Sequence, residues 1–239
     1  VRGLGITRFR GDGVELSPSS TGARIEGCLI GLGPDGSDQG QNASGIFING
    51  SPGHLIGGTT PAARNLLSGN GQHGIALSGA GATRTRIEGN WIGPGLDGLV
   101  DRGNSQQGIR CDNAPGNILG GSAPGAGNVI AGNDQNGIEL NNAGSSNNVV
   151  LGNLIGVAAS GSALKNNANG IAVGASGNRV GGPLSGEGNR IGFNGQRGVT
   201  VLSGTNNVIR GNRIHLNDGI GIDLGNNNVT ANDLGDADS

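Results

Sequence analysis

A short pattern recurs along the whole chain: a glycine, an apolar residue, one further residue and a second apolar residue. Its glycines stand 23 to 34 residues apart, and long and short intervals alternate. The full unit therefore spans about 62 residues. Self-similarity at this period is typical of solenoids, in which each repeat buries its apolar face against its neighbours. The glycines are Gly13, Gly45, Gly74, Gly108, Gly137, Gly170, Gly198 and Gly221.

Each interval holds three short segments with alternating apolar residues, bounded by glycine or asparagine. Examples are "GIAL" at residues 74–77, "RIEG" at 86–89 and "NWIG" at 90–93. Period-two alternation between turn-forming residues predicts β-strands, and no helical periodicity competes with it. Three strands per repeat predict an all-β solenoid, a right-handed parallel β-helix of about seven to eight coils. Loop insertions alternate around the third strand.

Asparagine is abundant, at 30 of 239 residues, and it recurs at equivalent positions of successive repeats. Asparagine tolerates the left-handed backbone of corners, and stacked amides can hydrogen-bond to one another along a solenoid. We expect two such columns. The first is Cys28, Asn65, Asn90, Asn128, Asn153, Asn189 and Asn212, and the second is Gln41, Asn70, Asn104, Asn133, Asn166, Asn194 and Asn217.

The same register predicts the interior. Aliphatic residues of the first and third strands point inward as two stacks. Cys28 and Cys111 lie about three coils, or roughly 14 Å, apart along the axis, so they are not expected to form a disulfide. The stacks are Val14, Ile46, Ile75, Ile109, Ile138, Ile171, Val199 and Ile222, and Ile30, Leu67, Ile92, Ile130, Ile155, Ile191 and Ile214.

Composition argues against two classes of partner. Charged residues are sparse and balanced at net −2, so no basic stripe exists to neutralise nucleic-acid phosphates. No apolar run approaches the roughly 20 residues of a membrane span. The chain begins at Val1 within the repeat pattern, so we expect one β-helix domain over residues 1–239, taken from a larger secreted protein, with an acidic tail at 225–239.

The repeats "GNWIGPGLDG…RGNSQQGI" and "NILGGSAPGAGNVIAGN" extend over essentially the whole chain. In them the sequence resembles the pectate lyase-like β-helix superfamily, and specifically secreted bacterial β-helix repeat proteins of unassigned activity. The resemblance implies an extracellular or cell-surface location. It also implies that a substrate, where there is one, lies on the face formed by the first strands.

Insertions flank the third strand on both sides and leave the other two faces with short turns. They could form the rims of a carbohydrate groove, with Trp91 as a stacking platform. The alternative is that the insertions fold down and bury this strip as a satellite core. The predicted groove residues are Leu66, Trp91, Val129, Arg190 and Arg213.

The first-strand face offers the best catalytic candidates. Arg110 and Glu139 fall on adjacent coils, and Asp112 lies two residues after Arg110. Asp112 and Glu139 are then diagonal neighbours, with Cα atoms about 8 Å apart, near the carboxylate spacing of an inverting glycosidase. The alternative is a cross-strand salt bridge on a solvated face. The pairs Arg24 with Glu26 and Arg86 with Glu88 repeat with the unit and indicate surface ion pairs.

Other polar residues give weaker signals. His73 precedes Gly74 in an "HG" pair that polygalacturonase-type hydrolases also contain, but the accompanying aspartate motifs are absent, which favours a turn residue. The tail concentrates carboxylates in a glycine- and asparagine-rich segment that could hold Ca²⁺, but a frayed acidic terminus is the simpler interpretation. Its aspartates are Asp223, Asp233, Asp236 and Asp238.

Two functions follow from these features. The regularity of the repeat favours a non-catalytic module, a rigid scaffold, adhesion or carbohydrate-binding segment of a larger secreted protein. The alternative is a polysaccharide lyase, glycoside hydrolase or epimerase, which rests on the resemblance. The expected partners are polysaccharide, flanking domains and, because an open β-helix exposes unpaired strand edges, further copies of the chain end to end.

Overall fold

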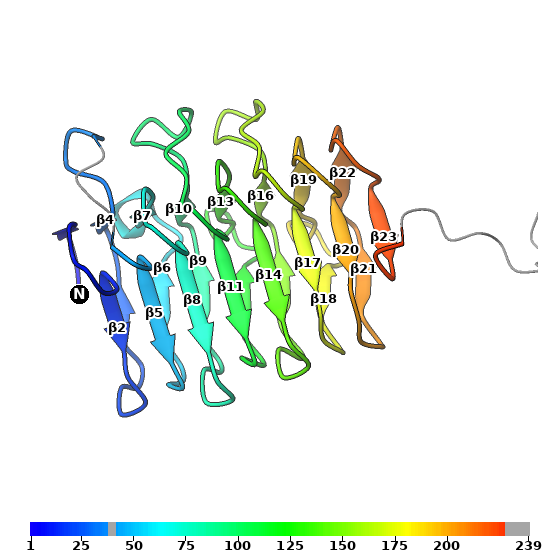
Figure 1. The fold of residues 1–239 in the computed structure, drawn as a ribbon, viewed down its shortest axis with the longest axis horizontal. Coiled ribbons are helices and arrows are strands. Elements are labelled where there is room, and N and C mark those ends of the chain that lie inside the picture. The colour runs from blue at the N-terminus through cyan, green and yellow to red at the C-terminus, as the bar shows by residue number, and fades with distance from the viewer. Residues whose placement is uncertain (38–41, 228–239) are drawn as a thin grey trace, which may run out of the picture.

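The chain winds into three parallel sheets that run along one axis, and the computed structural model describes residues 1–37 and 42–227 (Figure 1). We name the sheets first, second and third by the order of their strands in each repeat. The first sheet contains β2 (Val14–Leu16), β5 (Ile46–Asn49), β8 (Ile75–Ser78), β11 (Ile109–Asp112), β14 (Ile138–Asn141), β17 (Ile171–Val173), β20 (Val199–Val201) and β23 (Ile222–Leu224).

The second sheet has seven strands and the third sheet eight. The second contains β3 (Arg24–Ile25), β6 (Leu55–Gly57), β9 (Arg86–Glu88), β12 (Ile118–Gly120), β15 (Val149–Leu151), β18 (Arg179–Gly181) and β21 (Val208–Arg210). The third contains β1 (Gly5–Ile6), β4 (Leu29–Ile30), β7 (Leu66–Leu67), β10 (Trp91–Ile92), β13 (Val129–Ile130), β16 (Leu154–Ile155), β19 (Arg190–Gly192) and β22 (Arg213–His215).

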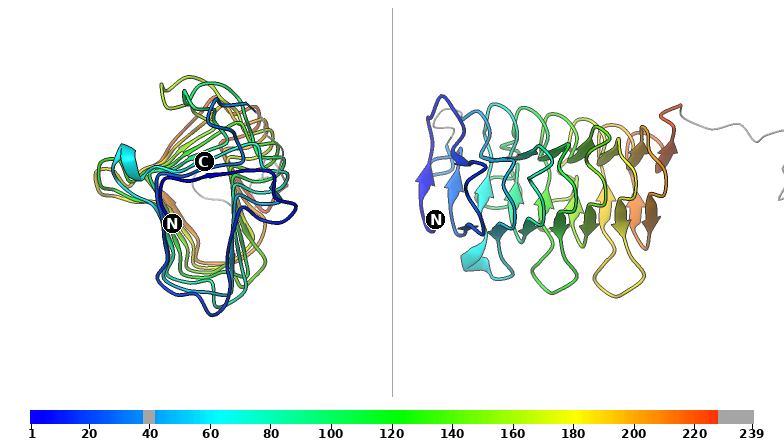
Figure 2. Two further views of the ribbon diagram at one scale, coloured as in Figure 1. Left: turned by 90° about the vertical axis from the view of Figure 1, so that its left-hand side faces the viewer. Right: turned by 90° about the horizontal axis from the view of Figure 1, so that it is seen from below.

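Strand pairing follows the repeat. Ile109 lies opposite Ile138 of the next coil, and Ile92 lies opposite Ile130. Viewed along the axis, successive coils superimpose on a common cross-section (Figure 2). The predicted right-handed parallel β-helix is thereby confirmed. Within the described residues, no helix has the length and apolar character of a membrane span.

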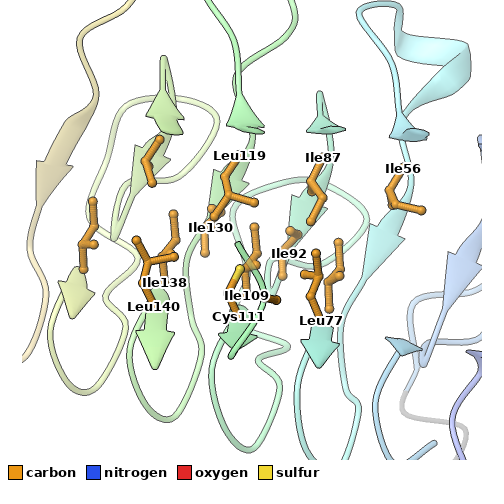
Figure 3. Close-up of a cluster of buried hydrophobic side chains, with 14 of the residues drawn as sticks. Ile56, Leu77, Ile87, Ile92, Ile109, Cys111, Leu119, Ile130, Ile138 and Leu140 are labelled. Atoms are coloured by element: carbon orange, nitrogen blue, oxygen red, sulfur yellow. The ribbon is translucent and has the colours of Figure 1, made fainter. Parts of the chain in front are cut away.

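The core is a continuous stack of aliphatic side chains between the three sheets (Figure 3). Both predicted inward columns belong to it, and their central members are fully buried. The exceptions are Val14 and Ile214, which are half-buried, and Ile222, which is 43% exposed, because among the described residues their strands pair with a neighbour on one side only. Cys28 and Cys111 are buried free thiols, as expected, and burial raises the pKa of Cys111 to about 12.

Two amide ladders run along the corners on either side of the third sheet. In the first, Asn90 Nδ2 donates to Asn128 Oδ1 at 3.0 Å, and Asn128 Nδ2 donates to Asn153 Oδ1 at 2.9 Å. The second ladder begins with Asn42, whose Nδ2 donates to Asn70 Oδ1 at 3.0 Å. Gln41, predicted for this place, lies outside the described residues. This coil has one residue fewer between the ladder and its glycine, which moves the position to Asn42.

A third amide column stands before the second sheet, where no ladder was predicted. Here Oδ1 of each asparagine accepts the backbone N–H of the preceding coil, as when Asn148 accepts from Asn117 at 2.8 Å. The side-chain Nδ2 groups of Asn117, Asn148 and Asn178 donate to backbone carbonyls instead of to one another. This column therefore satisfies corner backbone groups without forming a chain of amides. Its members are Asn117, Asn148, Asn178 and Asn207.

The insertions lie where the sequence placed them. Residues 59–64, 122–127 and 183–188 precede strands of the third sheet, and the first of these contains the short 3-10 helix η1 (Pro61–Ala63). Residues 94–103 and 157–165 follow such strands. The two groups project from different corners of the cross-section (Figure 2). The third sheet is thus bordered by loops on both sides.

Candidate functional site on the first sheet

A cavity of about 240 Å³ opens on the outer face of the first sheet, over β5, β8 and β11. Phe47 and Ala76 form its apolar part, because the register places Phe47 opposite Ala76 and Ala76 opposite Arg110. The polar lining comes from the strands and from the residues that directly precede them. These polar residues are Asp12, Ser44, Gln72, His73, Ser78, Arg110 and Asp112.

Arg110 stands between two carboxylates at the edge of this cavity. Its guanidinium lies 3.3 Å from Asp112 Oδ2 and 3.7 Å from Glu139 Oε2. Glu139 lies opposite Arg110 on the next strand, in the predicted register, and it accepts a hydrogen bond of 2.8 Å from Gln107 Nε2. The cross-strand salt bridge considered from the sequence is therefore present, and all three groups are half-buried or nearly so.

Burial changes the acidity of Glu139. Loss of water around the carboxylate raises its pKa above the ordinary value, and the nearby charge of Asp112 adds to this effect. Arg110 acts in the opposite direction but does not cancel the burial. Glu139 is consequently a carboxylate of raised pKa in a network in which Arg110 supplies the positive charge.

His73 is the residue that the sequence argument missed at this site. Only 5% of its surface is exposed, and the side chain of Gln107 is a hydrogen-bonding neighbour of its ring. Burial, and then the charge of Arg110, lower its pKa to about 4, so the ring is neutral at neutral pH. The available signal was positional: polar residues directly before the repeat glycines, including Asp12, His73 and Gln107, share one outer column.

The pKa of His73 predicts acid sensitivity. The unfolded chain binds a proton near pH 6.5 and the folded chain only near pH 4, so stability falls as pH drops through this window. A shift of this size corresponds to about 3 kcal/mol. We expect a His73→Gln variant to lose much less stability than the original protein between pH 6.5 and 4 in urea unfolding followed by circular dichroism. Parallel losses in the two proteins would contradict the assignment.

The apolar part of the predicted third-sheet groove is largely covered. Leu66 and Val129 are buried, with exposed fractions of 5% and 7%. Trp91 is half-buried, and the guanidinium carbon of Arg64 lies 4.4 Å from the centroid of its ring. A cavity of about 200 Å³ remains beside Trp91 and Arg64. The stacking face predicted for a sugar is thus occupied on one side by an arginine.

Arg190 and Arg213, the other two residues predicted for that groove, lie opposite each other on β19 and β22. Arg190 Nε donates to His215 Nε2 at 3.1 Å, and its Nη2 donates to the Gly161 carbonyl at 3.0 Å. Arg213 is exposed. Neither guanidinium forms an ion pair within residues 1–37 and 42–227.

Of the acidic tail, only Asp223 lies within the described residues. Its Oδ2 is 2.6 Å from Arg197 Nε and its side chain is fully buried. Asp233, Asp236 and Asp238 lie outside the described residues, so calcium binding by this group stays a prediction. In the described part of the chain, no three histidine, cysteine, aspartate or glutamate side chains gather as a metal ion would require.

The two arginine–glutamate pairs of the second sheet are as predicted. Arg24 lies 2.6 Å from Glu26, and Arg86 lies 2.7 Å from Glu88. Both arginine side chains are more than half exposed, so these contacts contribute little to stability.

Fold and cavity together define a right-handed parallel β-helix with a polar depression on one sheet. No protein-family model matches this chain, and no curated protein matches it. Two solved structures of the periplasmic alginate epimerase AlgG are similar to it. The single-mutant form has a TM-score of 0.57 at 17% identity, and the double-mutant form has a TM-score of 0.52 at 18% identity.

In both comparisons the similarity covers 89% of this chain and 47% of the AlgG chain. The chain therefore spans about half the length of the solved structures that it resembles. At this identity the likeness shows the β-helix fold alone, since one fold serves many chemistries.

Proposed function

We propose that the chain is a non-catalytic carbohydrate-binding segment of a larger secreted or cell-surface protein, and that it holds a sugar on the first sheet. The single observation that carries this proposal is the 240 Å³ cavity itself, in which the ring of Phe47 lies together with the polar side chains of His73, Arg110 and Asp112. An apolar surface combined with a few convergent polar groups is typical of ligand sites. Here Phe47 supplies the apolar surface, and Arg110 and Asp112 supply donors and acceptors.

The charges favour a neutral, hydroxyl-rich sugar. Arg110 is already matched by Asp112 and Glu139, so little positive charge is left for an acidic sugar. Hydroxyl groups can both donate to carboxylates and to neutral histidine and accept from guanidinium. Because the cavity is small, it can hold only a short part of a polysaccharide. This is compatible with a segment that binds the polymer without acting on it.

A polysaccharide-active enzyme of the pectate lyase-like superfamily, a lyase, glycoside hydrolase or epimerase, is the second candidate. It is favoured by the raised pKa of Glu139, together with a neutral His73 near the same network. Perturbed acidity within a cavity is characteristic of catalytic groups, although structural ion pairs also produce it. In this reading Glu139, Asp112 and Arg110 take part in the reaction.

Binding is tested with a panel of neutral and acidic oligosaccharides by isothermal titration calorimetry. Phe47→Ala is expected to weaken the best ligand about tenfold, because a sugar ring loses its apolar contact. Phe9→Ala is the matched control, since Phe9 is exposed and does not line the cavity. Equal losses in both variants, or no ligand in the panel, would contradict the proposal.

Catalysis is tested with the same panel, with and without Ca²⁺, by following new reducing ends and the absorbance of unsaturated products. We expect no turnover. Turnover that is lost in the Glu139→Gln variant would contradict the non-catalytic role and support the polysaccharide-active enzyme.

The remaining parts of the proposal are a secreted or surface location, flanking domains and end-to-end contacts between copies. The flanking domains and the end-to-end contacts are supported by the last described coil, in which Leu216 and Leu224 are 71% and 61% exposed. The secreted or surface location is supported by the fold shared with a periplasmic protein. Light scattering over a concentration series tests the self-association.

A further inference from the structure

Arg190 and Arg213 break the pattern of the outer third-sheet column. On the five preceding coils this column is apolar, and on the last two it is arginine. Positions that depart from a regular repeat without a structural reason are where functional sites are expected. The apolar members of the column are Leu29, Leu66, Trp91, Val129 and Leu154.

The strand arginines at 24, 86, 110 and 179 all pair with a carboxylate, whereas Arg190 and Arg213 do not. Arg210 on β21 also makes no ion pair with the described residues, but the residue opposite it on the neighbouring strand is Gly181 and not a second arginine. Arg190 and Arg213 instead stand in register on adjacent strands, about 4.8 Å apart at the backbone. Two neighbouring guanidinium groups repel each other unless an anion lies between or above them.

Two hydrogen bonds hold the side chain of Arg190 in place. It donates to His215 Nε2 and to the Gly161 carbonyl, and the ring of His215 is itself braced edge to face against Phe193, with centroids 5.3 Å apart. These contacts fix one guanidinium and leave part of its donor fork unused. A structural role explains Arg190, which ties down the 157–165 insertion. It does not explain Arg213, whose exposed side chain makes no hydrogen bond or ion pair with the described residues.

We propose that Arg190 and Arg213 form an oxyanion-binding site on the third sheet, for the sulfate or carboxylate groups of an acidic polysaccharide. Planar guanidinium forks match both groups in geometry and charge. The site lies on a different sheet from the His73 cavity and does not depend on it. A polysaccharide bound here would meet unpaired positive charge, whereas a sugar at the first sheet meets an arginine that is already paired with carboxylates.

The test compares dextran sulfate, polygalacturonate, unmodified dextran and inorganic sulfate as ligands of the whole chain at low salt, by calorimetry. At least one of the two acidic polymers is expected to bind and unmodified dextran is not, and the better acidic polymer identifies the anion. Arg213→Ala should weaken that polymer about tenfold. Displacement of the bound polymer by inorganic sulfate would show that the site recognises the oxyanion group and not the sugar ring.

Arg210→Ala is the matched control, because it removes an exposed arginine of the same coil that lies on the second sheet, where it makes no ion pair with the described residues. It should leave the affinity unchanged. An equal loss in both variants would show unspecific attraction to positive charge and overturn the site. So would acidic polymers that bind no better than dextran, or an Arg213→Ala variant with unaltered affinity. Phe47→Ala should not affect this binding.

Discussion

Replacement of Gly93 by alanine is expected to destabilise the fold by more than about 4 kcal/mol and to leave little native protein. Gly93 directly follows β10 and has a φ of +102°. A Cβ atom at this position would overlap the carbonyl oxygen of Ala131 on the next coil. It would also press against the side chain of Asn133, a member of the second ladder. Neither neighbour can retreat, because both belong to rigid stacks. Solubility, circular dichroism and urea unfolding would measure the effect.

Gly116→Ala separates the two causes of that cost. Gly116 has a similar left-handed backbone, with φ of +67°, but no atom lies within 4 Å of a Cβ placed there. Only the conformational cost remains, about 1 kcal/mol. If the two variants lost the same stability, the close approach of successive coils would not be the reason that glycine is required at position 93.

The amide ladder predicts the second large effect. Asn128→Ala is expected to cost about 4 kcal/mol in urea unfolding. Asn128 Oδ1 accepts hydrogen bonds from the backbone N–H and from the side-chain Nδ2 of Asn90. Asn128 Nδ2 donates to the Ile87 carbonyl at 2.8 Å. Its removal leaves the Asn90 backbone N–H without this acceptor and takes a donor from Asn153 Oδ1. Each buried polar group left unpaired costs about 1–3 kcal/mol.

Asn141→Ala is the control for the ladder. Asn141 lies on β14 and is half-buried, but its side chain makes no hydrogen bond within the described residues. Its removal should cost less than about 1 kcal/mol. A similar loss at both positions would show that the hydrogen bonds between coils are not the source of the cost at Asn128.

The solenoid was predictable because its determinants repeat. A residue contacts its equivalent one coil away, so a single correct alignment of Gly74 with Gly108 fixes sheets, core and corner amides together. The error at Gln41 arose where one coil is a residue shorter. The Asn117 column was missed because its turns vary in sequence, and only the amide position is constant.

The candidate sites were less predictable, because burial outside the core depends on neighbours that the repeat does not determine. The register alone placed Arg110 opposite Glu139, and this is observed. It could not show that Arg64 would stack on Trp91, since Arg64 belongs to an insertion. Nor could it show that His73 would be enclosed, since this depends on side chains from the adjacent coils, such as Arg110.

Both amide ladders also give the molecule a direction. In every step that the structure describes, the side-chain nitrogen donates toward the higher-numbered coil, from Asn65 to Asn90 in one ladder and from Asn70 to Asn104 in the other. The small dipoles therefore add instead of cancelling. At the last rungs, Nδ2 of Asn212 and of Asn217 donates to a backbone carbonyl and has no further amide to donate to within the described residues. At the first rungs, Oδ1 of Asn65 and of Asn42 already accepts a backbone N–H, from Cys28 and from Phe9. Any molecule that stacks on the far coil must therefore bring acceptors for these two amides.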